Sequence, residues 1–511
     1  MKFRLYALLL AILATFTLTA CGGSDSDNGN EPPTEEQPGD DNDDGDDGDN
    51  GDDGSLDVPS TYSFPNADGE STVAYTGQTK RHILLADLVV EMNNLEEDAG
   101  QDSVESELNF YFRYDAATSD NITSEFNARD LDGMTILPED SGELTYGAIA
   151  GGKDLIGKIA GGDGQGNGEV ANLIDGEFFG WEDGLEADAL PVDLVDYYFA
   201  ALAHEATDGV SPQIETVDGS VALDTVTIDA HGRDLRQLTQ KFLLGAVAFS
   251  QGTNDYLQSD FANMLELESD NAYTEGEHNW DEAFGYFGAA RDYGDYTIDE
   301  IRNVGYKDTN GDDAIDIRSE FNFGNSTNCA KRDAGTAGNT NPTDYTAEVF
   351  DAFLTGRAIL REAAQTGELT GDRQTELNEQ IEVAALTWEK CIAATVVHYI
   401  NDTVADLEAT ENGKFQDLAH FKNLAKHWGE MKGFALNLQF SPESPFRADA
   451  EALADLKEIL SLMGDAPVLA DGTQAGQAFE GGVEQYIADM LAARTLMQDA
   501  YGFDAENVEN W

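Results

Sequence analysis

Apolar residues recur with a helical period in the second half of the chain. In the stretch 234–252, the apolar positions that share one face are Leu235, Leu238, Phe242, Ala246 and Phe249. Spacings of three and four residues place side chains on one side of an α-helix, and a glycine just past the last apolar position is typical of a helix end. We therefore predict an amphipathic helix that ends at Gly252.

Four later stretches show the same period, at 346–367, 371–404, 448–464 and 483–502. Three of them close on a glycine, namely Gly367, Gly464 and Gly502, as expected of helix C-termini. The stretch 371–404 carries the stripe Leu377, Ile381, Ala384, Trp388, Cys391, Thr395 and Tyr399. Its roughly thirty helical residues would span about 45 Å. Long amphipathic helices joined by short loops predict a bundle over 234–511.

The region 59–233 is less regular. Helices are expected at 77–95 and 191–209, a short strand or a loop at 221–232, and a glycine-rich loop within 147–168. The fold class predicted from these patterns is predominantly all-α, a large multi-helix bundle with long irregular loops. The region 59–233 forms its N-terminal, mostly helical part.

The first twenty residues have the pattern of an export signal. Lys2 and Arg4 precede an apolar run, which is too short for a lasting membrane span. Leu18 to Cys21 resembles the cleavage box of bacterial lipoproteins, which implies that residues 1–20 are removed and Cys21 is lipidated. Gly22 follows instead of aspartate, which in such proteins favours the outer membrane. A plain signal peptide is the alternative. We expect a lipid-anchored envelope protein, facing either the periplasm or the outside.

Residues 21–58 have the composition of a disordered tether. Fifteen acidic residues and no lysine or arginine lie between residues 22 and 57, so this segment has too little apolar surface to fold. Weak calcium binding by its Asp-Gly pairs is the alternative to a solvated linker. Removing these fifteen acidic residues from the net charge of −72 leaves −57 on the remainder. Such a surface repels nucleic acids and attracts cations, although a salt-adapted source would also explain it.

Two cysteines remain after Cys21. In an exported protein we expect Cys329 and Cys391 to form a disulfide, with a catalytic thiol as the alternative. Their number excludes cysteine-rich metal sites.

The stretch 308–320 resembles a calcium-binding loop. Its positions one, three, five, seven and nine are Asp308, Asn310, Asp312, Ala314 and Asp316, which would supply oxygen ligands. Two features depart from an EF-hand: Asp313 replaces the glycine of position six, and the acid Glu320 stands one residue late. We favour a structural calcium ion over an empty acidic loop.

The stretch GEHNWDEAFGYFG, 276–288, has two interpretations. Asn279 and Glu282 could form a capping box at the start of a helix that buries Phe284 and Phe287. Alternatively, His278 could bind a metal ion with Asp281 or Glu282, and iron and zinc are the candidate ions. Further ligands would then come from elsewhere in the chain.

The best further candidates are His420, His427 and Glu430. The two histidines are seven residues apart on one helical face, and Glu430 lies one turn beyond His427. A histidine at the edge of the core, bonded to a neighbouring helix, is the alternative.

Three phrases carry a family resemblance: YTGQTKRHILLADLV, GEHNWDEAFGYFG and HWGEMKGFALNLQFSP. They resemble a family of bacterial lipoproteins, domain of unknown function 4856, over most of residues 60–510. More distantly, Gly276, His278 and Asp281 are similar to the G-x-H-x-x-E motif of imelysin-like proteins, with aspartate in place of glutamate. That likeness implies a helical envelope protein linked to iron acquisition, with His278 and Asp281 as metal ligands.

Two functions follow as hypotheses. The first is a lipoprotein that binds a metal cation, for uptake of iron or another metal, through His278, Asp281 and Glu282 together with His420, His427 and Glu430. The second is a calcium-stabilised envelope scaffold that binds a protein or glycan partner without catalysis. A hydrolase is the weakest hypothesis, because the sequence offers no recognised nucleophile or zinc motif.

Overall fold

The computed structural model describes residues 56–95, 100–138, 142–162, 173–207 and 211–511. The predicted signal peptide, Cys21 and the tether as far as residue 55 lie outside the described residues. Leu56–Trp511 form one compact unit. Both predicted stretches, 59–233 and 234–511, contribute helices to it.

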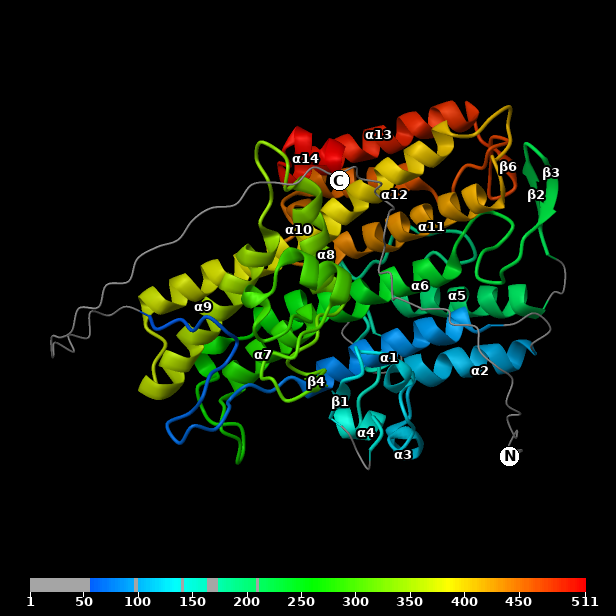
Figure 1. Ribbon diagram of the computed structural model, residues 1–511. Coiled ribbons are helices and arrows are strands. Elements are labelled where there is room, and N and C mark those ends of the chain that lie inside the picture. The colour runs from blue at the N-terminus through cyan, green and yellow to red at the C-terminus, as the bar shows by residue number, and fades with distance from the viewer. Residues whose placement is uncertain (1–55, 96–99, 139–141, 163–172, 208–210) are drawn as a thin grey trace, which may run out of the picture. The chain divides into compact units, whose positions relative to one another are not determined.

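Helices dominate this unit (Figure 1). Those of the first half are α1 (Thr76–Asn93), α2 (Gln101–Phe112), α3 (Ala116–Ser119), α4 (Tyr146–Ile149), α5 (Pro191–Thr207), α6 (Leu235–Leu243) and α7 (Glu275–Phe287). Those of the second half are α8 (Gly324–Thr336), α9 (Tyr345–Thr366), α10 (Gly371–Glu408), α11 (Leu418–Ala435), α12 (Ala450–Met463), α13 (Gly482–Tyr501) and α14 (Ala505–Asn510). The predicted all-α fold class is confirmed.

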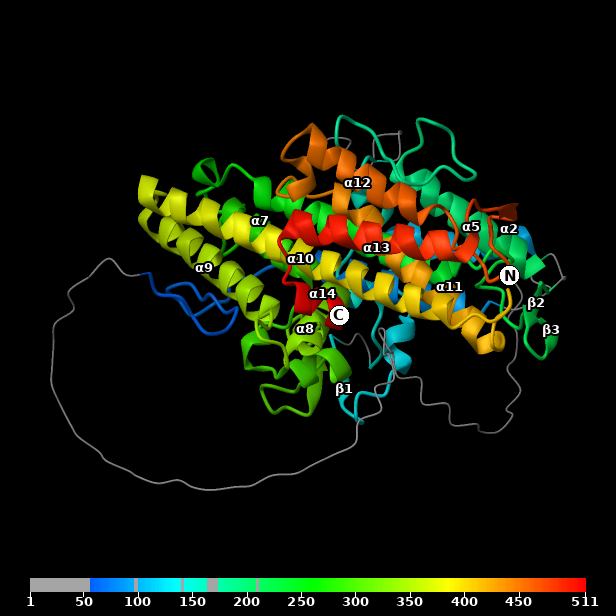
Figure 2. The ribbon, with the colours of Figure 1, turned by 90° about the horizontal axis from the view of Figure 1, so that it is seen from above.

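The long helices pack in successive layers, with α1 and α2 against α5 and α6, and α6 against α11 (Figures 1 and 2). Helix α10 packs against α9, α11 and α13, and α12 packs against α13. At 38 residues α10 is the central element of this arrangement, and at 1.5 Å per residue it spans about 57 Å. The side chains of Trp280, Trp388 and Trp428 are fully buried between the layers.

Strands are few and short in the described residues. They form three two-stranded sheets, β1 (Thr135–Leu137) with β4 (Ala314–Asp316), β2 (Gln213–Thr216) with β3 (Gly219–Ala222), and β5 (Thr473–Gln474) with β6 (Gln477–Ala478). The β1–β4 pair is parallel, with Ile136 opposite Ile315. It therefore joins the N-terminal part of the chain to the predicted calcium loop.

Several helix ends lie where the sequence predicts them. Gly367 and Gly502 follow α9 and α13 in the left-handed conformation, with φ of 74° and 64°, which glycine adopts without steric cost. Thr370 caps α10 by accepting a hydrogen bond from the backbone N–H of Arg373. These ends depend on local sequence alone.

The predicted helix end at Gly252 is wrong. Past Leu243 the helix continues as π-helical turns at Leu244–Phe249 and Gln251–Asp255. A Cβ added to Gly252 would lie 2.6 Å from the Trp388 ring. The glycine is therefore explained by the close approach of α10, and it lies inside the helical segment.

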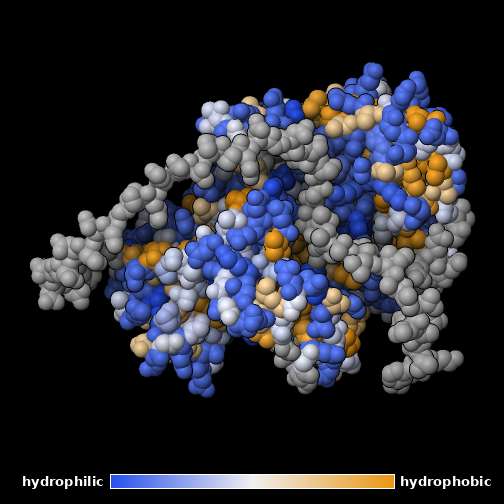
Figure 3. Space-filling view, viewed as in Figure 1, coloured by the Kyte–Doolittle hydropathy of each residue, from blue (hydrophilic) through white to orange (hydrophobic). Residues whose placement is uncertain are grey.

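Polar side chains dominate the face of the molecule in Figure 3, and apolar residues form scattered patches. None of the helices in the described part of the chain is both long and apolar enough to cross a membrane.

Candidate functional site

Helix α7 begins earlier than the predicted capping box. Its N-cap is Thr274, whose hydroxyl accepts from the backbone N–H of Glu277, while the Glu277 carboxylate accepts from the backbone N–H of Thr274. This reciprocal pair is a capping box. The predicted box of Asn279 and Glu282 is wrong by five residues, because both already lie within the helix.

Asp281 faces the core. Its Oδ1 accepts from Arg357 Nε at 2.8 Å and from the Tyr62 hydroxyl at 2.8 Å, and its Oδ2 accepts from the backbone N–H of Ala74 at 3.0 Å. Arg357 also donates to Glu277 at 2.7 Å, and none of these three charged side chains is exposed to solvent. The arginine neutralises the acid of the imelysin-like motif, so this carboxylate is part of a buried ion pair.

His278 lies at the surface side of α7. Its Nδ1 is 2.6 Å from Glu268 Oε2, and its Nε2 is 4.0 Å from Glu282 Oε1. Glu282 also accepts a hydrogen bond from Gln78 Nε2 at 2.7 Å. Of the three metal ligands predicted in this stretch, His278 and Glu282 lie together, and Asp281 points away from them.

The remaining predicted ligands lie on α11. His427 Nδ1 is 2.8 Å from Asp406 Oδ2, and His420 Nε2 is 2.7 Å from the Asp406 backbone carbonyl. Glu430 is buried and lies 3.3 Å from Lys241 Nζ of α6. Glu430 is thus neutralised by a lysine, in the same manner as Asp281 by Arg357.

A cluster of histidines and carboxylates lines the seam between α10 and α11. His398 Nε2 is 3.3 Å from Asp402 Oδ2, and His427 Nε2 approaches the same oxygen at 3.8 Å. We call His398, Asp402, Asp406 and His427 the seam cluster. Three of its members come from α10 at intervals of four residues, so they share one face of that helix. These four side chains are 14–32% exposed, so the cluster can be reached from solvent.

The two histidines of the seam cluster titrate differently. Burial lowers the pKa of His398 to about 2, and the charge of Arg332 adds to this effect. Burial also opposes the charged form of His427, but the hydrogen bond and charge of Asp406 and the charge of Asp402 outweigh it and raise the pKa. Burial raises the pKa of the Asp402 carboxyl.

The six predicted ligands do not form one site. Helices α7 and α11 lie well apart in both Figures 1 and 2. Moreover, in the described ranges no three His, Cys, Asp or Glu side chains stand in an arrangement that could hold a metal ion. The joint site therefore fails because its members lie on separate elements, and two of them, Asp281 and Glu430, are neutralised by Arg357 and Lys241.

Sequence reasoning missed His398, Asp402 and Asp406. The signal that could have found them is the i, i+4, i+8 spacing of a histidine and two acids on one long helix. It was masked because the apolar stripe of the same helix dominates the pattern. Their meeting with His427 depends on the packing of α10 on α11.

The stretch 308–320 has the backbone of a turn built around Asp308. Its carboxylate accepts from the N–H groups of Gly311, Asp312 and Asp313, at 2.7, 3.2 and 3.0 Å. Asp313 at position six has φ of 63°, the left-handed conformation for which EF-hand loops use glycine and which aspartate tolerates. Asp313 therefore adopts at position six the conformation for which glycine is usually needed.

The last two predicted calcium ligands have other partners. Both oxygens of Asp316 accept from Arg318, at 2.9 and 2.8 Å. Glu320 is 4% exposed and accepts from Thr309 through Oε1 and from the backbone N–H of Asp316 through Oε2. Asp316 is therefore the weakest of the proposed ligands, and Glu320 would reach an ion only after turning from Thr309.

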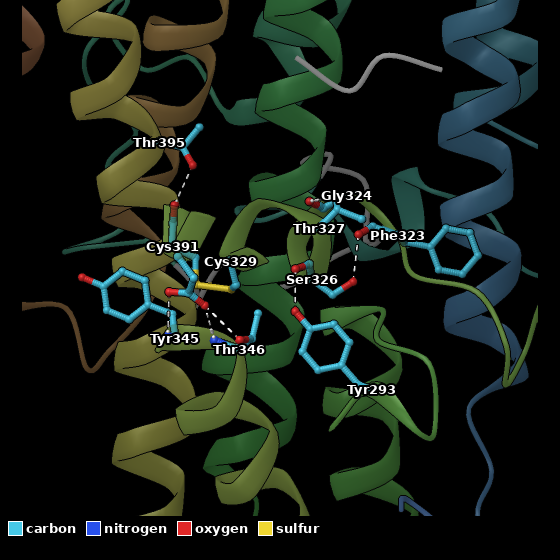
Figure 4. Close-up of a disulfide and its surroundings, with 11 residues drawn as sticks. Tyr293, Phe323, Gly324, Ser326, Thr327, Cys329, Tyr345, Thr346, Cys391 and Thr395 are labelled. Carbon is cyan, nitrogen blue, oxygen red and sulfur yellow. Dashed lines mark hydrogen bonds between the residues drawn. A yellow bond between two sulfur atoms is a disulfide. The ribbon is translucent and has the colours of Figure 1, made fainter. Parts of the chain in front are cut away.

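Cys329 of α8 and Cys391 of α10 are joined by a disulfide, as Figure 4 shows. Both residues are buried, and the Cα atoms are 4.8 Å apart. Beside it, the Asp333 carboxylate accepts from the backbone N–H groups of Tyr345 and Thr346. The disulfide and these bonds tie α8 to the start of α9 and to the middle of α10.

Comparison with known proteins gives a family. The model of the family described as "Domain of unknown function (DUF4856)" matches residues 185–465, which is more than half of the 511 residues. The chain belongs to the DUF4856 family. No curated protein and no solved structure matches it.

The DUF4856 segment runs from just before α5 to the end of α12. It contains GEHNWDEAFGYFG and HWGEMKGFALNLQFSP, whereas YTGQTKRHILLADLV, where α1 begins, lies before it. The seam cluster and the loop 308–320 both fall within the segment. The β1 partner of that loop does not.

Proposed function

We propose that this DUF4856 protein is a lipid-anchored scaffold of the bacterial cell envelope whose helical unit is stabilised by calcium bound to the loop 308–320. The observation that carries the proposal is the backbone of this loop. The Asp308 carboxylate accepts hydrogen bonds from three backbone N–H groups, and Asp313 has the left-handed conformation. Strand β4 follows directly. This is the order of features in an EF-hand loop.

The ligands would come mainly from the first half of the loop. Asp308, Asn310 and Asp312 would offer side-chain oxygens and Ala314 its carbonyl. Glu320 would complete the set by turning from Thr309, because one bidentate acid normally closes such a loop. An ion held there would fix β4 and, through the β1–β4 ladder, the N-terminal residues 135–137. Calcium would thus stabilise contacts between distant parts of the chain.

Two further observations support an envelope location. Residues 1–21 have the pattern of a lipoprotein signal, and the Cys329–Cys391 disulfide is typical of oxidising compartments. Extracellular calcium modules bind with dissociation constants of about 10⁻⁴–10⁻³ M. A loop with an imperfect ligand set would be expected to bind calcium with an affinity in this range.

The test is thermal unfolding of the full chain with and without calcium. A site in that affinity range predicts about 2 kcal/mol of stabilisation at about 10 mM Ca²⁺. Asp308→Ala and Asp312→Ala should each abolish this calcium-dependent gain. The control is Asp299→Ala, a change at an exposed acid of the same region that is paired with Arg302, and this variant should retain the gain.

Magnesium at the same concentration separates binding from screening of the acidic surface. Mg²⁺ demands a tighter octahedral site but screens charge equally well. An equal gain from both ions, or an undiminished gain in Asp308→Ala, would overturn the calcium proposal.

A second candidate function, the binding of a metal cation for uptake, draws support from the seam cluster. Two imidazoles facing one carboxylate are the donor types that borderline divalent ions prefer.

A further inference from the structure

We propose that the first turn of α1, together with Arg81 and Lys153, binds a small oxyanion that carries two negative charges, namely phosphate or the phosphate group of a small molecule. Two cationic side chains without a carboxylate partner in the described residues meet there, in a chain whose net charge is −72. The site is separate from the calcium loop and does not depend on the scaffold proposal.

Arg81 of α1 is a buried cation. Its side chain is 7% exposed, and its Nε donates to the backbone carbonyl of Asp154 at 2.7 Å. Among the described residues, no carboxylate lies within ion-pair distance of the guanidinium, and Nη1 and Nη2 have no hydrogen-bond partner. A buried charge is normally paired with an opposite charge. The outer edge of this guanidinium therefore favours an anionic ligand.

Lys153 reaches the same point from the glycine-rich loop. A Cβ added to Gly77 would lie 3.1 Å from Lys153 Cε and 3.6 Å from Arg81 Nη1. The loop is held against α1 because Lys80 Nζ donates to the Ala150 carbonyl at 2.8 Å. Lys153 itself is exposed and, in the described ranges, has no ion-pair or hydrogen-bond partner. Two cations thus lie beside one residue of the first helical turn.

The start of α1 adds backbone donors to these cations. No side chain caps this helix, and its first turn carries no acid. The backbone N–H groups of Thr76 and Gly77 donate to no described residue. Unpaired N–H groups and the positive end of the helix dipole attract anions. Arginine and lysine next to such donors match a phosphate group, which accepts several charge-assisted hydrogen bonds.

A buried hydroxyl lies next to Arg81. Tyr286 of α7 is fully buried, and Arg81 Cζ lies 5.9 Å from the centre of its ring. Its hydroxyl has no hydrogen-bond partner in the part of the chain that the structure describes, which is rare for a buried polar atom. Burial raises the pKa of this hydroxyl. It therefore keeps its proton and can donate to an anion beside the arginine.

The nearby carboxylates have other partners. Those of Asp154, Asp255 and Glu282 act on the Tyr286 hydroxyl together with Arg81. They contact a backbone N–H group, a lysine and a glutamine respectively. The ordinary alternative is that these carboxylates balance the buried arginine at longer range, with no ligand. Under that alternative the exposed Lys153 has no binding role, so a change at Lys153 separates the two explanations.

The experiment is a calorimetric titration of the full chain with inorganic phosphate, at constant ionic strength and without calcium. We expect one saturable site. Lys153→Met, a change at an exposed residue, should weaken binding by about 10–100-fold, because it removes one charge-assisted hydrogen bond. Arg81→Met should weaken it at least as much. Thr76→Asp places an acid in the first turn, which favours the helix but repels the anion, so a fully folded variant should lose binding.

The matched control is Lys457→Met, which removes an exposed lysine of α12 that also lies over an aromatic ring. It should bind phosphate as the unaltered chain does, and so should Asp308→Ala in the calcium loop. Acetate, with one charge, should bind more weakly than phosphate. The proposal is overturned by absence of saturable binding, by undiminished binding in folded Lys153→Met or Thr76→Asp, by an equal loss in Lys457→Met, or by equal affinity for acetate.

Discussion

At the start of α7, the carboxylates of Glu277 and Asp281 face a buried arginine, whereas at the seam of α10 and α11 the carboxylates of Asp402 and Asp406 face histidines. The first group is closed to solvent, and the second is partly open. Both lie on helices that carry the histidine and acid residues from which metal sites are built, His278 with Asp281 on α7 and His398 with Asp402 on α10.

The difference lies in the counter-charge. An arginine stays protonated at any physiological pH and occupies its carboxylates permanently. A histidine can lose its proton and then offer a lone pair to a metal ion. Arg357 therefore occupies the acid of the imelysin-like motif, whereas the carboxylates of the i, i+4, i+8 row on α10 are paired with ionisable histidines.

The largest expected effect comes from breaking the Arg357 network. Arg357→Met leaves Glu277 and Asp281 buried without their cation, which should cost about 3–5 kcal/mol of unfolding free energy. Chemical denaturation followed by circular dichroism measures it. Arg302→Met, which removes an exposed pair with Asp299, should change stability by less than about 1 kcal/mol. Equal effects of the two changes would show that the α7 network is not a buried ion pair.

His82 of α1, which packs against the end of α7, and His427 of the seam cluster should respond to pH in opposite directions. Burial lowers the pKa of His82, whose Nε2 lies 3.0 Å from the Gly285 carbonyl of α7, to about 4. Its contribution to the free energy of unfolding is fully present above the unfolded pKa of about 6.5. This contribution falls by up to about 3 kcal/mol as the pH falls towards 4. His427 has a raised pKa, so its contribution is present below about 6.5 and is lost as the pH rises through the raised value.

The measurement is the stability of the unaltered chain minus that of His82→Gln or His427→Gln, from pH 4.5 to pH 8, with calcium and no transition metal. The stability difference between the unaltered chain and His82→Gln should grow as the pH rises, and the difference for His427→Gln should shrink. Two differences with the same sign of slope would contradict the contrast between the regions.

The smallest expected effect concerns the start of α7. Thr274→Ala removes the cap and should cost about 1 kcal/mol. It should also speed hydrogen exchange at the Glu277 amide, which donates to the Thr274 hydroxyl. Asn279→Ala, at the position where the sequence pattern placed the cap, loses a bond to Ser259 but should leave that amide protected. Faster exchange of this amide in Asn279→Ala than in Thr274→Ala would instead support the capping box of Asn279 and Glu282 that the sequence pattern predicted.

The candidate sites were predictable only in part. The loop 308–320 could be located from sequence because its ligand types are contiguous, and the structure adds that Asp313 fits the left-handed position. His427 could be listed from sequence, but its partners could not. A residue such as Asp402 is one of many acids on helical surfaces, and nothing local distinguishes it from a solvated charge.

Most of the long helices and many of their ends could be located from the sequence, whereas α2 and α8 were not predicted. Apolar periodicity and glycines such as Gly367 act through contacts within a few residues, so they can be interpreted without the fold. Three other features depend on packing between distant segments: the helix runs past Gly252 beneath Trp388, Arg357 neutralises Asp281, and His427 meets Asp402. Each of these pairs is far apart in the chain, and its partners meet only when the helices pack.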